Sequence, residues 1–252
     1  MKLFEKIKKI FTFIEDGFSK EHSCICCGIE IVDGSFAQLC ENCLKKIDKI
    51  KEPVCSKCGE RLYEGLLQCD YCKEFDYNFD SSRSYCYYDE YSSKIIKGLK
   101  YSGKKYFARH IATLMVENKE LFNGVDMLVP VPVTTKTKRV RGFNQAEEIA
   151  NEISTLVGVP VKNVLVKSKD HKHQAGLSQK ERLENLKDSF ELNKEFENDV
   201  KGKTIMVIDD VFTTGATANE VAKVLKKKKP KAIMVYTAAK TKLNSINSAK
   251  NW

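Results

Sequence analysis

The pattern of apolar and polar positions changes along the chain. Residues 2–18 carry apolar side chains at three- and four-residue spacings with lysines between them, which predicts an amphipathic helix over residues 1–20. Two roles are open for this helix. It either docks on the body of the protein, or it lies on a membrane surface or a partner.

From residue 81 onward, strand signals alternate with helix signals. Strands that alternate with helices form a mostly parallel sheet flanked by helices, so we predict an α/β fold for this region. A polar, basic stretch at residues 167–180 interrupts the alternation and is expected to be mobile. The predicted strands are residues 84–88, 125–129, 161–166, 204–208 and 232–236, and the predicted helices are residues 95–99, 107–116, 144–153, 181–186 and 216–225.

The cysteines divide the chain into unequal parts. Nine of the ten lie before residue 73, and only Cys86, which we expect to be buried in a strand, lies beyond it. We therefore predict a small cysteine-rich domain over residues 21–80 and a larger domain over residues 81–252. A chain of 252 residues with 42% hydrophobic residues can bury a substantial core.

The N-terminal residues indicate a cytosolic protein. Lysines and a glutamate interrupt each apolar run before it reaches signal-peptide length, and no stretch approaches the roughly 18 apolar residues that span a bilayer. We therefore expect that the chain is not an integral membrane protein. Peripheral attachment of the N-terminal helix at the inner face of the membrane remains an alternative. In a reducing compartment, clustered cysteines are more often metal ligands than disulfides.

Eight of the cysteines form four Cys-x-x-Cys pairs. Two residues between thiolates let one turn aim both sulfurs at one ion, and Zn²⁺ takes four ligands, so the array predicts two closed structural zinc sites. Gly28 and Gly59 follow the first and third pairs, whereas the second leads into a helix-like stretch, which favours sequential over interleaved sites. The pairs are Cys24/Cys27, Cys40/Cys43, Cys55/Cys58 and Cys69/Cys72, separated by 12, 11 and 10 residues.

Charge is unevenly placed along the chain. Residues 1–80 hold 12 Lys and Arg against 15 Asp and Glu, whereas residues 81–252 hold 31 against 19. An anionic partner, either a pyrophosphate or a nucleic acid, is therefore expected on the larger domain.

Residues 207–217 combine an apolar strand, two consecutive carboxylates and a Thr-Thr-Gly-Ala-Thr loop before a helix. Gly215 permits a tight loop, in which backbone amides and threonine hydroxyls converge on a phosphate at the helix N-terminus. Asp209 and Asp210 end their strand, where they can accept hydrogen bonds from ribose hydroxyls, directly or through Mg²⁺. The residues of this predicted site are Asp209, Asp210, Thr213, Thr214, Gly215, Ala216 and Thr217.

This segment resembles the phosphoribosyl pyrophosphate signature of type I phosphoribosyltransferases. In that family the acidic pair binds the 2′ and 3′ hydroxyls of the ribose, and the loop binds the 5′-phosphate. Further motifs, with the cysteine-rich front end, look like those of the ComF family (competence protein F, also GntX-like) over residues from about 20 to 240. These motifs are Val129-Pro-Val-Pro-Val133, Arg139-Val-Arg-Gly-Phe-Asn-Gln145 and His173-Gln-Ala-Gly-Leu-Ser178.

The resemblance implies a type I phosphoribosyltransferase fold preceded by a double zinc ribbon. It also implies an enzyme that transfers the phosphoribosyl group of Mg²⁺-bound phosphoribosyl pyrophosphate to an unidentified acceptor, in connection with DNA uptake. The loop at residues 133–137 would then bind pyrophosphate, and the stretch 167–180 would close over the site. The cations that the resemblance assigns to the ligand are Lys136, Arg139, Arg141 and, from the N-terminal side of the domain, Lys100.

A second hypothesis makes the chain a non-catalytic phosphoribosyl-binding module of DNA uptake. Its zinc ribbons would dock a helicase-like or recombination partner, and its basic domain would contact single-stranded DNA. The acidic charge of the cysteine-rich region argues against DNA binding there. The lysine run at residues 226–229 is either a DNA contact or the solvated end of a helix.

Overall fold

The computed structural model describes residues 23–31, 39–101, 105–168 and 188–242. The helix predicted over residues 1–20 and the helix at 181–186 lie outside these residues, as does the basic stretch beyond residue 168. The chain divides into two compact units, residues 1–46 and 47–252. Each unit is described by itself.

The first unit contains a turn at the first cysteine pair and one short helix. The Cys24 amide donates to the Ile29 carbonyl (2.8 Å), and the Gly28 amide donates to the Cys24 carbonyl (2.8 Å). Helix α2 (Glu41–Lys45) begins directly after Cys40, which is its N-cap residue. The helix therefore includes Cys43 itself, and only Leu44 and Lys45 of the helix-like stretch expected after the second pair are helical.

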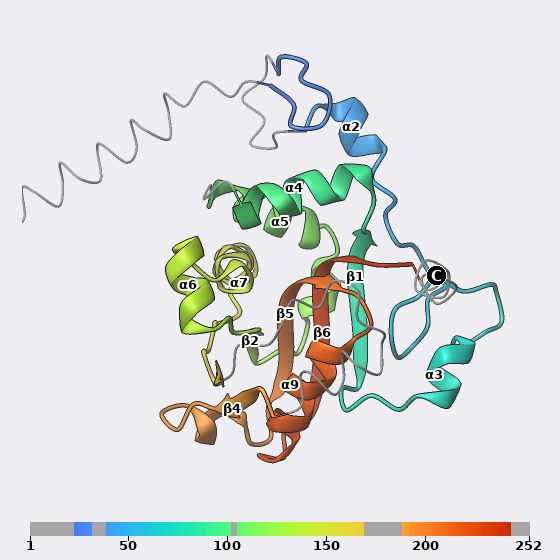
Figure 1. Ribbon diagram of the computed structural model, residues 1–252. Helices are drawn as coiled ribbons and strands as arrows, with labels where there is room; N and C mark the ends of the chain where they lie inside the picture. The colour runs from blue at the N-terminus through green and yellow to red at the C-terminus, as the bar shows by residue number, and fades with distance from the viewer. Residues whose placement is uncertain (1–22, 32–38, 102–104, 169–187, 243–252) are drawn as a thin grey trace, which may run out of the picture. The chain divides into compact units, whose positions relative to one another are not determined.

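The second unit is built on a four-stranded parallel sheet in the order β1-β6-β5-β2 (Figure 1). Residues 205–208 of β5 are all buried, as expected for a parallel strand covered on both faces. The mostly parallel sheet predicted from the sequence is confirmed. The strands are β1 (Ser81–Tyr87), β2 (Met127–Pro130), β5 (Thr204–Phe212) and β6 (Ala232–Lys240).

Helices pack on this sheet and on one another. Helices α5 and α7 contact each other and the sheet, α4 contacts α5, and α9 connects β5 to β6. The helices of the second unit are α3 (Asp70–Glu74), α4 (Glu90–Tyr101), α5 (Tyr106–Met115), α6 (Thr135–Arg141), α7 (Gln145–Val157) and α9 (Ala216–Lys226), with 3-10 turns η1 (Lys119–Phe122) and η2 (Glu197–Val200).

The strand predicted at residues 161–166 is divided in the structure. Val161 forms a single parallel bridge with Leu128 of β2. Strand β3 (Leu165–Lys167) instead leaves the main sheet and pairs antiparallel with β4 (Phe190–Leu192). The apolar run therefore contributes to two sheets, and the prediction of one continuous strand is wrong.

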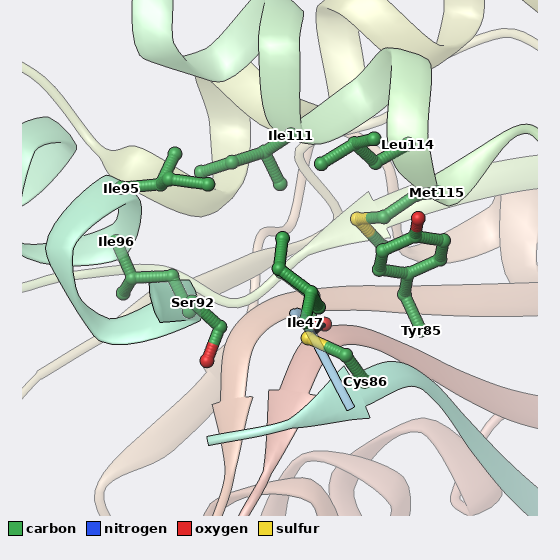
Figure 2. Close-up of a pocket in the computed structure, with 10 residues that line it drawn as sticks. Ile47, Tyr85, Cys86, Ser92, Ile95, Ile96, Ile111, Leu114 and Met115 are labelled. Atoms are coloured by element: carbon green, nitrogen blue, oxygen red, sulfur yellow. Dashed lines mark hydrogen bonds between the residues drawn. The ribbon is translucent and has the colours of Figure 1, made fainter. Parts of the chain in front are cut away.

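A small apolar cavity lies where α4 and α5 meet β1 (Figure 2). Cys86 lines it and is 3% exposed, and its thiol donates to the Ala238 carbonyl (3.3 Å). The burial expected for this cysteine is confirmed. The other lining residues are apolar apart from Ser92 and the hydroxyl of Tyr85, so we interpret the cavity as a packing void of the core.

The third and fourth cysteine pairs belong to the core of the second unit. All four cysteines are buried in one cluster with residues of β5, β6 and α9. The Ser82 amide of β1 donates to the Lys57 carbonyl (2.7 Å), and a side chain at Gly59 would stand 2.6 Å from the Ser82 carbonyl. The second compact unit therefore begins at residue 47, whereas the change in cysteine content along the sequence lies near residue 80.

Candidate functional site

The acidic pair, Asp209 and Asp210, lies near the carboxyl end of β5. Asp209 is in register with Thr237 of β6, and the Val131 amide after β2 donates to the Ile208 carbonyl (2.9 Å). The end of β2 thus borders the same edge. The carboxyl ends of parallel strands are the usual ligand edge of an α/β sheet.

Lys100, in the last turn of α4, contacts the acidic pair directly. Its ammonium lies 2.7 Å from Oδ2 of Asp210, and the two side chains are 24% and 14% exposed. Burial lowers the pKa of Lys100, but the charge and hydrogen bond of Asp210, with the charge of Asp209, outweigh it and raise this pKa above its ordinary value. Lys100 is therefore a fixed cation of this site.

The ionised form of Asp209 is unfavourable in the unliganded site. Burial, followed by the charge of Asp210, raises the pKa of Asp209 to about 7, although Asp209 accepts a hydrogen bond from the Asp210 amide (2.8 Å). Hydroxyl donors or a cation would relieve this cost. The arrangement fits a ligand that brings ribose hydroxyls or Mg²⁺.

The loop at residues 213–217, which the sequence predicts to bind a ribose phosphate and which is called the ribose-phosphate loop below, turns from β5 into α9. Gly215 is the N-cap residue of α9 with φ of +76°, and a side chain there would stand 2.7 Å from the rings of Phe212 and Tyr77. Only glycine fits this turn. A small hollow follows the loop, and its lining includes Asp209, Thr213, Gly215, Ala216 and Thr217.

Thr214 turns away from the hollow. It is buried, its hydroxyl accepts from the Ala216 amide (3.4 Å), and its carbonyl accepts from the Tyr77 hydroxyl (2.8 Å). The other four residues of the loop line the hollow at the N-terminus of an 11-residue helix. The first amides of a helix have no partner within it and favour an anion.

The segment expected as a basic loop after β2 is largely helical. The Thr134 hydroxyl accepts from the Thr137 amide (3.2 Å) and caps α6, so the loop expected at residues 133–137 shortens. Lys136 and Arg139 lie three residues apart on α6 and are exposed. We find no contact of either with the acidic pair among the residues that the structure describes.

Arg141, at the end of α6, is the basic residue of this helix that approaches the site. Its side chain is half-buried and donates to Oε1 of Gln145 (3.0 Å). Its positive charge acts to lower the pKa of Lys100, so the two cations are near each other. Arg141 is therefore the basic residue of α6 whose charge acts on the site.

Sequence reasoning missed two side chains around the site, Tyr77 and Asn78, and placed a third, Lys167, only as the first residue of the stretch expected to close over it. The charge of Lys167, on β3, acts on Asp209, and Tyr77 and Asn78 hold the loop and α9. Local patterns at these positions carry no signal, because each reaches the site through pairing of distant segments.

The cysteines form two groups of four in sequential order. In each group the ligand atoms lie within 4.8 Å of one another, so the donors fit a tetrahedral zinc ion. Sequential pairing is confirmed and the interleaved alternative is wrong. The first cysteine group is Cys24, Cys27, Cys40 and Cys43, and the second cysteine group is Cys55, Cys58, Cys69 and Cys72.

Both groups repeat one local construction. Gly28 and Gly59 adopt φ of +74° and +69° after their first knuckles, and Cys40 and Cys69 are the N-cap residues of α2 and α3. Burial differs between them. All four cysteines of the second group are buried, whereas Cys27 in the first is exposed.

Within the described part of the chain, no helix has both the length and the apolar character needed to cross a bilayer.

Comparison with known proteins identifies the family of this chain. Residues 105–250 match the phosphoribosyl transferase domain family. Competence protein F of Haemophilus influenzae is 30% identical over 209 residues, which cover 80% of this chain and 90% of that protein.

Two further relatives extend the comparison. DNA utilization protein YhgH of Escherichia coli K12 is 25% identical over 225 residues (86% of this chain, 96% of that protein). Competence protein ComFC of Bacillus subtilis is 26% identical over 212 residues (79% and 83%). With its phosphoribosyl transferase domain and its two groups of four cysteines, the chain belongs to the ComF family.

Proposed function

We propose that the chain binds Mg²⁺-phosphoribosyl pyrophosphate at the carboxyl edge of its sheet and transfers the phosphoribosyl group to a nitrogen acceptor. The observation that carries the proposal is the half-buried acidic pair, held beside Lys100 and followed by the loop at the N-terminus of α9. The names of the relatives, competence protein F and DNA utilization protein, support a setting in DNA uptake.

Each group of site residues binds a different part of the ligand. Asp209 and Asp210 accept hydrogen bonds from the 2′ and 3′ hydroxyls, which lowers the cost of keeping Asp209 ionised. The amides of the ribose-phosphate loop and the hydroxyls of Thr213 and Thr217 hold the 5′-phosphate. Arg141 is placed to meet the pyrophosphate, and Lys100 keeps Asp210 oriented. Lys136 and Arg139 are exposed on α6, so they reach the pyrophosphate only if their side chains adopt other rotamers.

The reaction is a displacement at C1 of the ribose. The bond between C1 and the pyrophosphate oxygen breaks, the acceptor nitrogen bonds to C1, and the nitrogen proton leaves to solvent or to the departing pyrophosphate. Positive charge develops on the ribose ring, where the carboxylates of the acidic pair stabilise it by position and charge. Bound Mg²⁺ supplies charge neutralisation of the pyrophosphate.

Calorimetry should show binding of phosphoribosyl pyrophosphate that requires Mg²⁺, with a dissociation constant on the order of micromolar. Ribose 5-phosphate should bind more weakly, because it lacks the pyrophosphate. A screen of bases and amines that detects released pyrophosphate should then identify the acceptor class. No binding in the presence of Mg²⁺ would overturn the proposal, and binding without release by any acceptor would favour a non-catalytic module.

The second candidate is a non-catalytic module that contacts single-stranded DNA, and a lysine cluster favours it. At the amino edge of the sheet the Gly202 amide donates to the Lys229 carbonyl (3.0 Å), and the Lys231 amide donates to the Lys203 carbonyl (2.9 Å). These bonds gather the lysine cluster, Lys201, Lys203, Lys226, Lys227, Lys228, Lys229 and Lys231. Asp209 lies five residues after Thr204, the first residue of β5, so roughly 17 Å of strand separates the lysine cluster from the acidic pair.

Exposed apolar side chains support the docking role that the second candidate gives to the cysteine-rich region. Tyr63 and Leu67, between the third and fourth cysteine pairs, are 87% and 82% exposed. Large apolar side chains exposed together often mark a protein interface. A helicase-like or recombination partner that covers this loop fits the second candidate.

The DNA interaction predicts a salt-dependent affinity. Replacing Lys227 and Lys229 by alanine should lower the slope of log affinity against log salt by about 0.7 for each phosphate that the variant no longer neutralises. Lys97→Ala with Lys119→Ala, two exposed lysines elsewhere, is the matched control and should keep the slope. Fluorescence titration of a labelled oligonucleotide gives the measurement. An affinity that salt does not change, or equal slopes in both variants, would remove the cluster from consideration.

A further inference from the structure

We propose that the second cysteine group positions the ribose-phosphate loop, so that metal bound by these cysteines sets the affinity of the loop for phosphate. The inference rests on the function proposed above for residues 213–217. Two chains of contacts join the cysteine group to the loop. One passes through Tyr77 and its neighbours, and the other passes through Lys240.

Tyr77 connects the fourth cysteine pair with the loop. It follows Cys72 by five residues, is 3% exposed, and its hydroxyl donates to the Thr214 carbonyl (2.8 Å). Its ring stacks on Phe79 with centroids 4.6 Å apart and meets Phe212 edge-on at 6.3 Å. The rings of Tyr77 and Phe212 are also those that close over Gly215. The conformation of the loop therefore depends on where Tyr77 is held.

The next residue of the same segment holds the helix that carries the site. The backbone amide and the side-chain amide of Asn78 both donate to Oδ1 of Asn219, at 2.7 and 3.0 Å. Asn219 is buried in the first turns of α9, and its own amide donates to the Gly215 carbonyl (2.8 Å). The segment therefore fixes both the loop and the N-terminus of α9.

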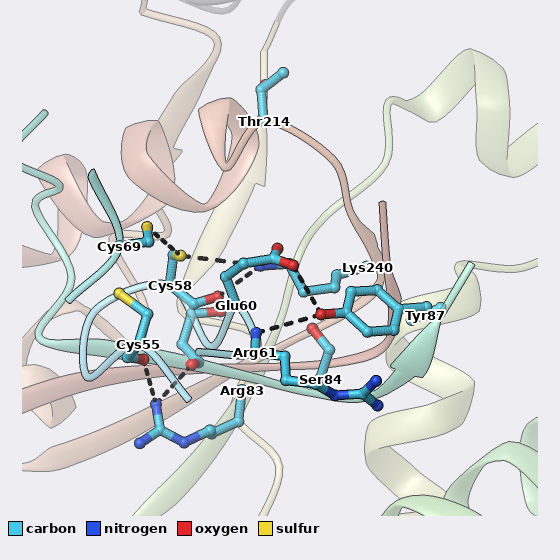
Figure 3. A network of polar contacts seen from close by, with 12 residues as sticks. Cys55, Cys58, Glu60, Arg61, Cys69, Arg83, Ser84, Tyr87, Thr214 and Lys240 are labelled. Atoms are coloured by element: carbon cyan, nitrogen blue, oxygen red, sulfur yellow. Dashed lines mark hydrogen bonds and ion pairs between the residues drawn. The ribbon is translucent and has the colours of Figure 1, made fainter. Parts of the chain in front are cut away.

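Lys240 provides the second connection (Figure 3). It is 1% exposed, its ammonium lies 2.8 Å from Oε2 of Glu60, and it donates to the Cys58 carbonyl (3.1 Å) with the Cys58 sulfur at 3.9 Å. A buried ammonium requires negative partners. Four thiolates around Zn²⁺ carry a formal net charge of −2, which adds to that of Glu60.

From Lys240 the connection reaches the loop through the sheet. Lys240 is in register with Phe212, its ammonium lies 5.4 Å from the ring centroid of Phe212, and the Thr241 amide donates to the Phe212 carbonyl (2.9 Å). Phe212 directly precedes the loop. Both connections therefore end on residues 212–215, and both begin at a cysteine of the second group.

The first test removes one hydroxyl and keeps the packing. Tyr77→Phe should weaken binding of Mg²⁺-phosphoribosyl pyrophosphate by roughly tenfold, because the loop loses its anchor at Thr214. The matched control is Tyr236→Phe, because the Tyr236 hydroxyl donates to the Met115 carbonyl (2.7 Å) and Tyr236 is also 3% exposed. The control should keep the affinity. Equal losses of affinity in the two variants would mean that the Tyr77 hydroxyl contributes only to general stability, and would overturn the proposal.

Hydrogen exchange tests the same anchor without a ligand. Amides of residues 213–217 should exchange faster in Tyr77→Phe than in the unaltered protein, and Tyr236→Phe should leave them unchanged. Unaltered exchange in Tyr77→Phe contradicts the positioning role. If the unaltered protein binds no phosphoribosyl pyrophosphate, the proposed function fails while this measurement still decides the inference.

The cysteines supply a second matched pair. Cys69 and Cys40 are the N-cap residues of α3 and α2, so serine at either position removes one thiolate from an equivalent place. Cys69→Ser should lower both zinc content and ligand affinity, and should speed exchange of the loop amides. Cys40→Ser should lower zinc content alone. A Cys69→Ser protein that has lost its metal but keeps the full affinity and exchange pattern would refute the proposal.

Discussion

Asparagine at position 209 is expected to make the unliganded protein more stable at pH 8 while weakening its binding of Mg²⁺-phosphoribosyl pyrophosphate by roughly a hundredfold. Burial and the charge of Asp210 raise the pKa of Asp209 to about 7, so its ionised form is costly without a ligand. Asparagine keeps the oxygen that accepts from the Asp210 amide and removes the charge. The ligand loses a charge-assisted acceptor. Calorimetry of unfolding and of binding measures both effects.

The pH dependence of stability gives the sign of the Asp209 effect. The folded pKa of Asp209, about 7, lies above the roughly 3.9 expected in the unfolded chain. Its contribution to stability is therefore fully present below the unfolded pKa and is lost as pH rises through the folded pKa. The difference in melting temperature between Asp209→Asn and the unaltered protein should widen up to about pH 7 and then level off. Parallel curves would contradict the assigned cause.

Asp210→Asn is the matched control and should act in the opposite direction on the free protein. Asp210 holds the ammonium of Lys100 at 2.7 Å in a largely buried pair, and its replacement leaves that cation with the weaker influence of the Asp209 charge. Breaking such a pair should destabilise the protein by on the order of 1–3 kcal/mol. A stabilised Asp210→Asn protein would show that Lys100 does not depend on this carboxylate.

The parts of the site that the sequence predicts are those with local causes. The strand, the acidic pair, Gly215 and the start of α9 follow one another in the chain, so apolar runs and turn chemistry reveal them. The sequential zinc groups were also predictable, because Gly28 and Gly59 mark equivalent turns.

The remaining parts depend on tertiary pairing or on weak local patterns. Helix α6 has no buried residue, so its sequence lacks the apolar period that would distinguish it from a basic loop. Tyr77 and Thr214 are 137 residues apart in the chain. Lys100 was assigned to the ligand by resemblance, but its contact with Asp210 requires the last turn of α4 to reach the carboxyl end of β5. None of these contacts leaves a periodic signal in the sequence.

Removal of metal is expected to occur in two steps of very different ease. Cys27 is exposed, whereas the four cysteines of the second group are buried in the core with β5, β6 and α9. A chelator should therefore take one zinc ion from the first group while the sheet keeps its cooperative melting transition. The second ion should leave only as the second unit unfolds, because structural zinc contributes on the order of 10 kcal/mol.

Metal analysis should begin at about two zinc ions per chain, the number that two four-thiolate groups hold. Release can be followed with a chromophoric indicator while circular dichroism reports the helices. Cys40→Ser should abolish the fast step and leave the slow one. Release of both ions at one rate, or a slow step without a change in circular dichroism, would mean that the core does not depend on the second ion. Because the second cysteine group joins the core beside Phe212, release of its ion and disordering of the ribose-phosphate loop should coincide.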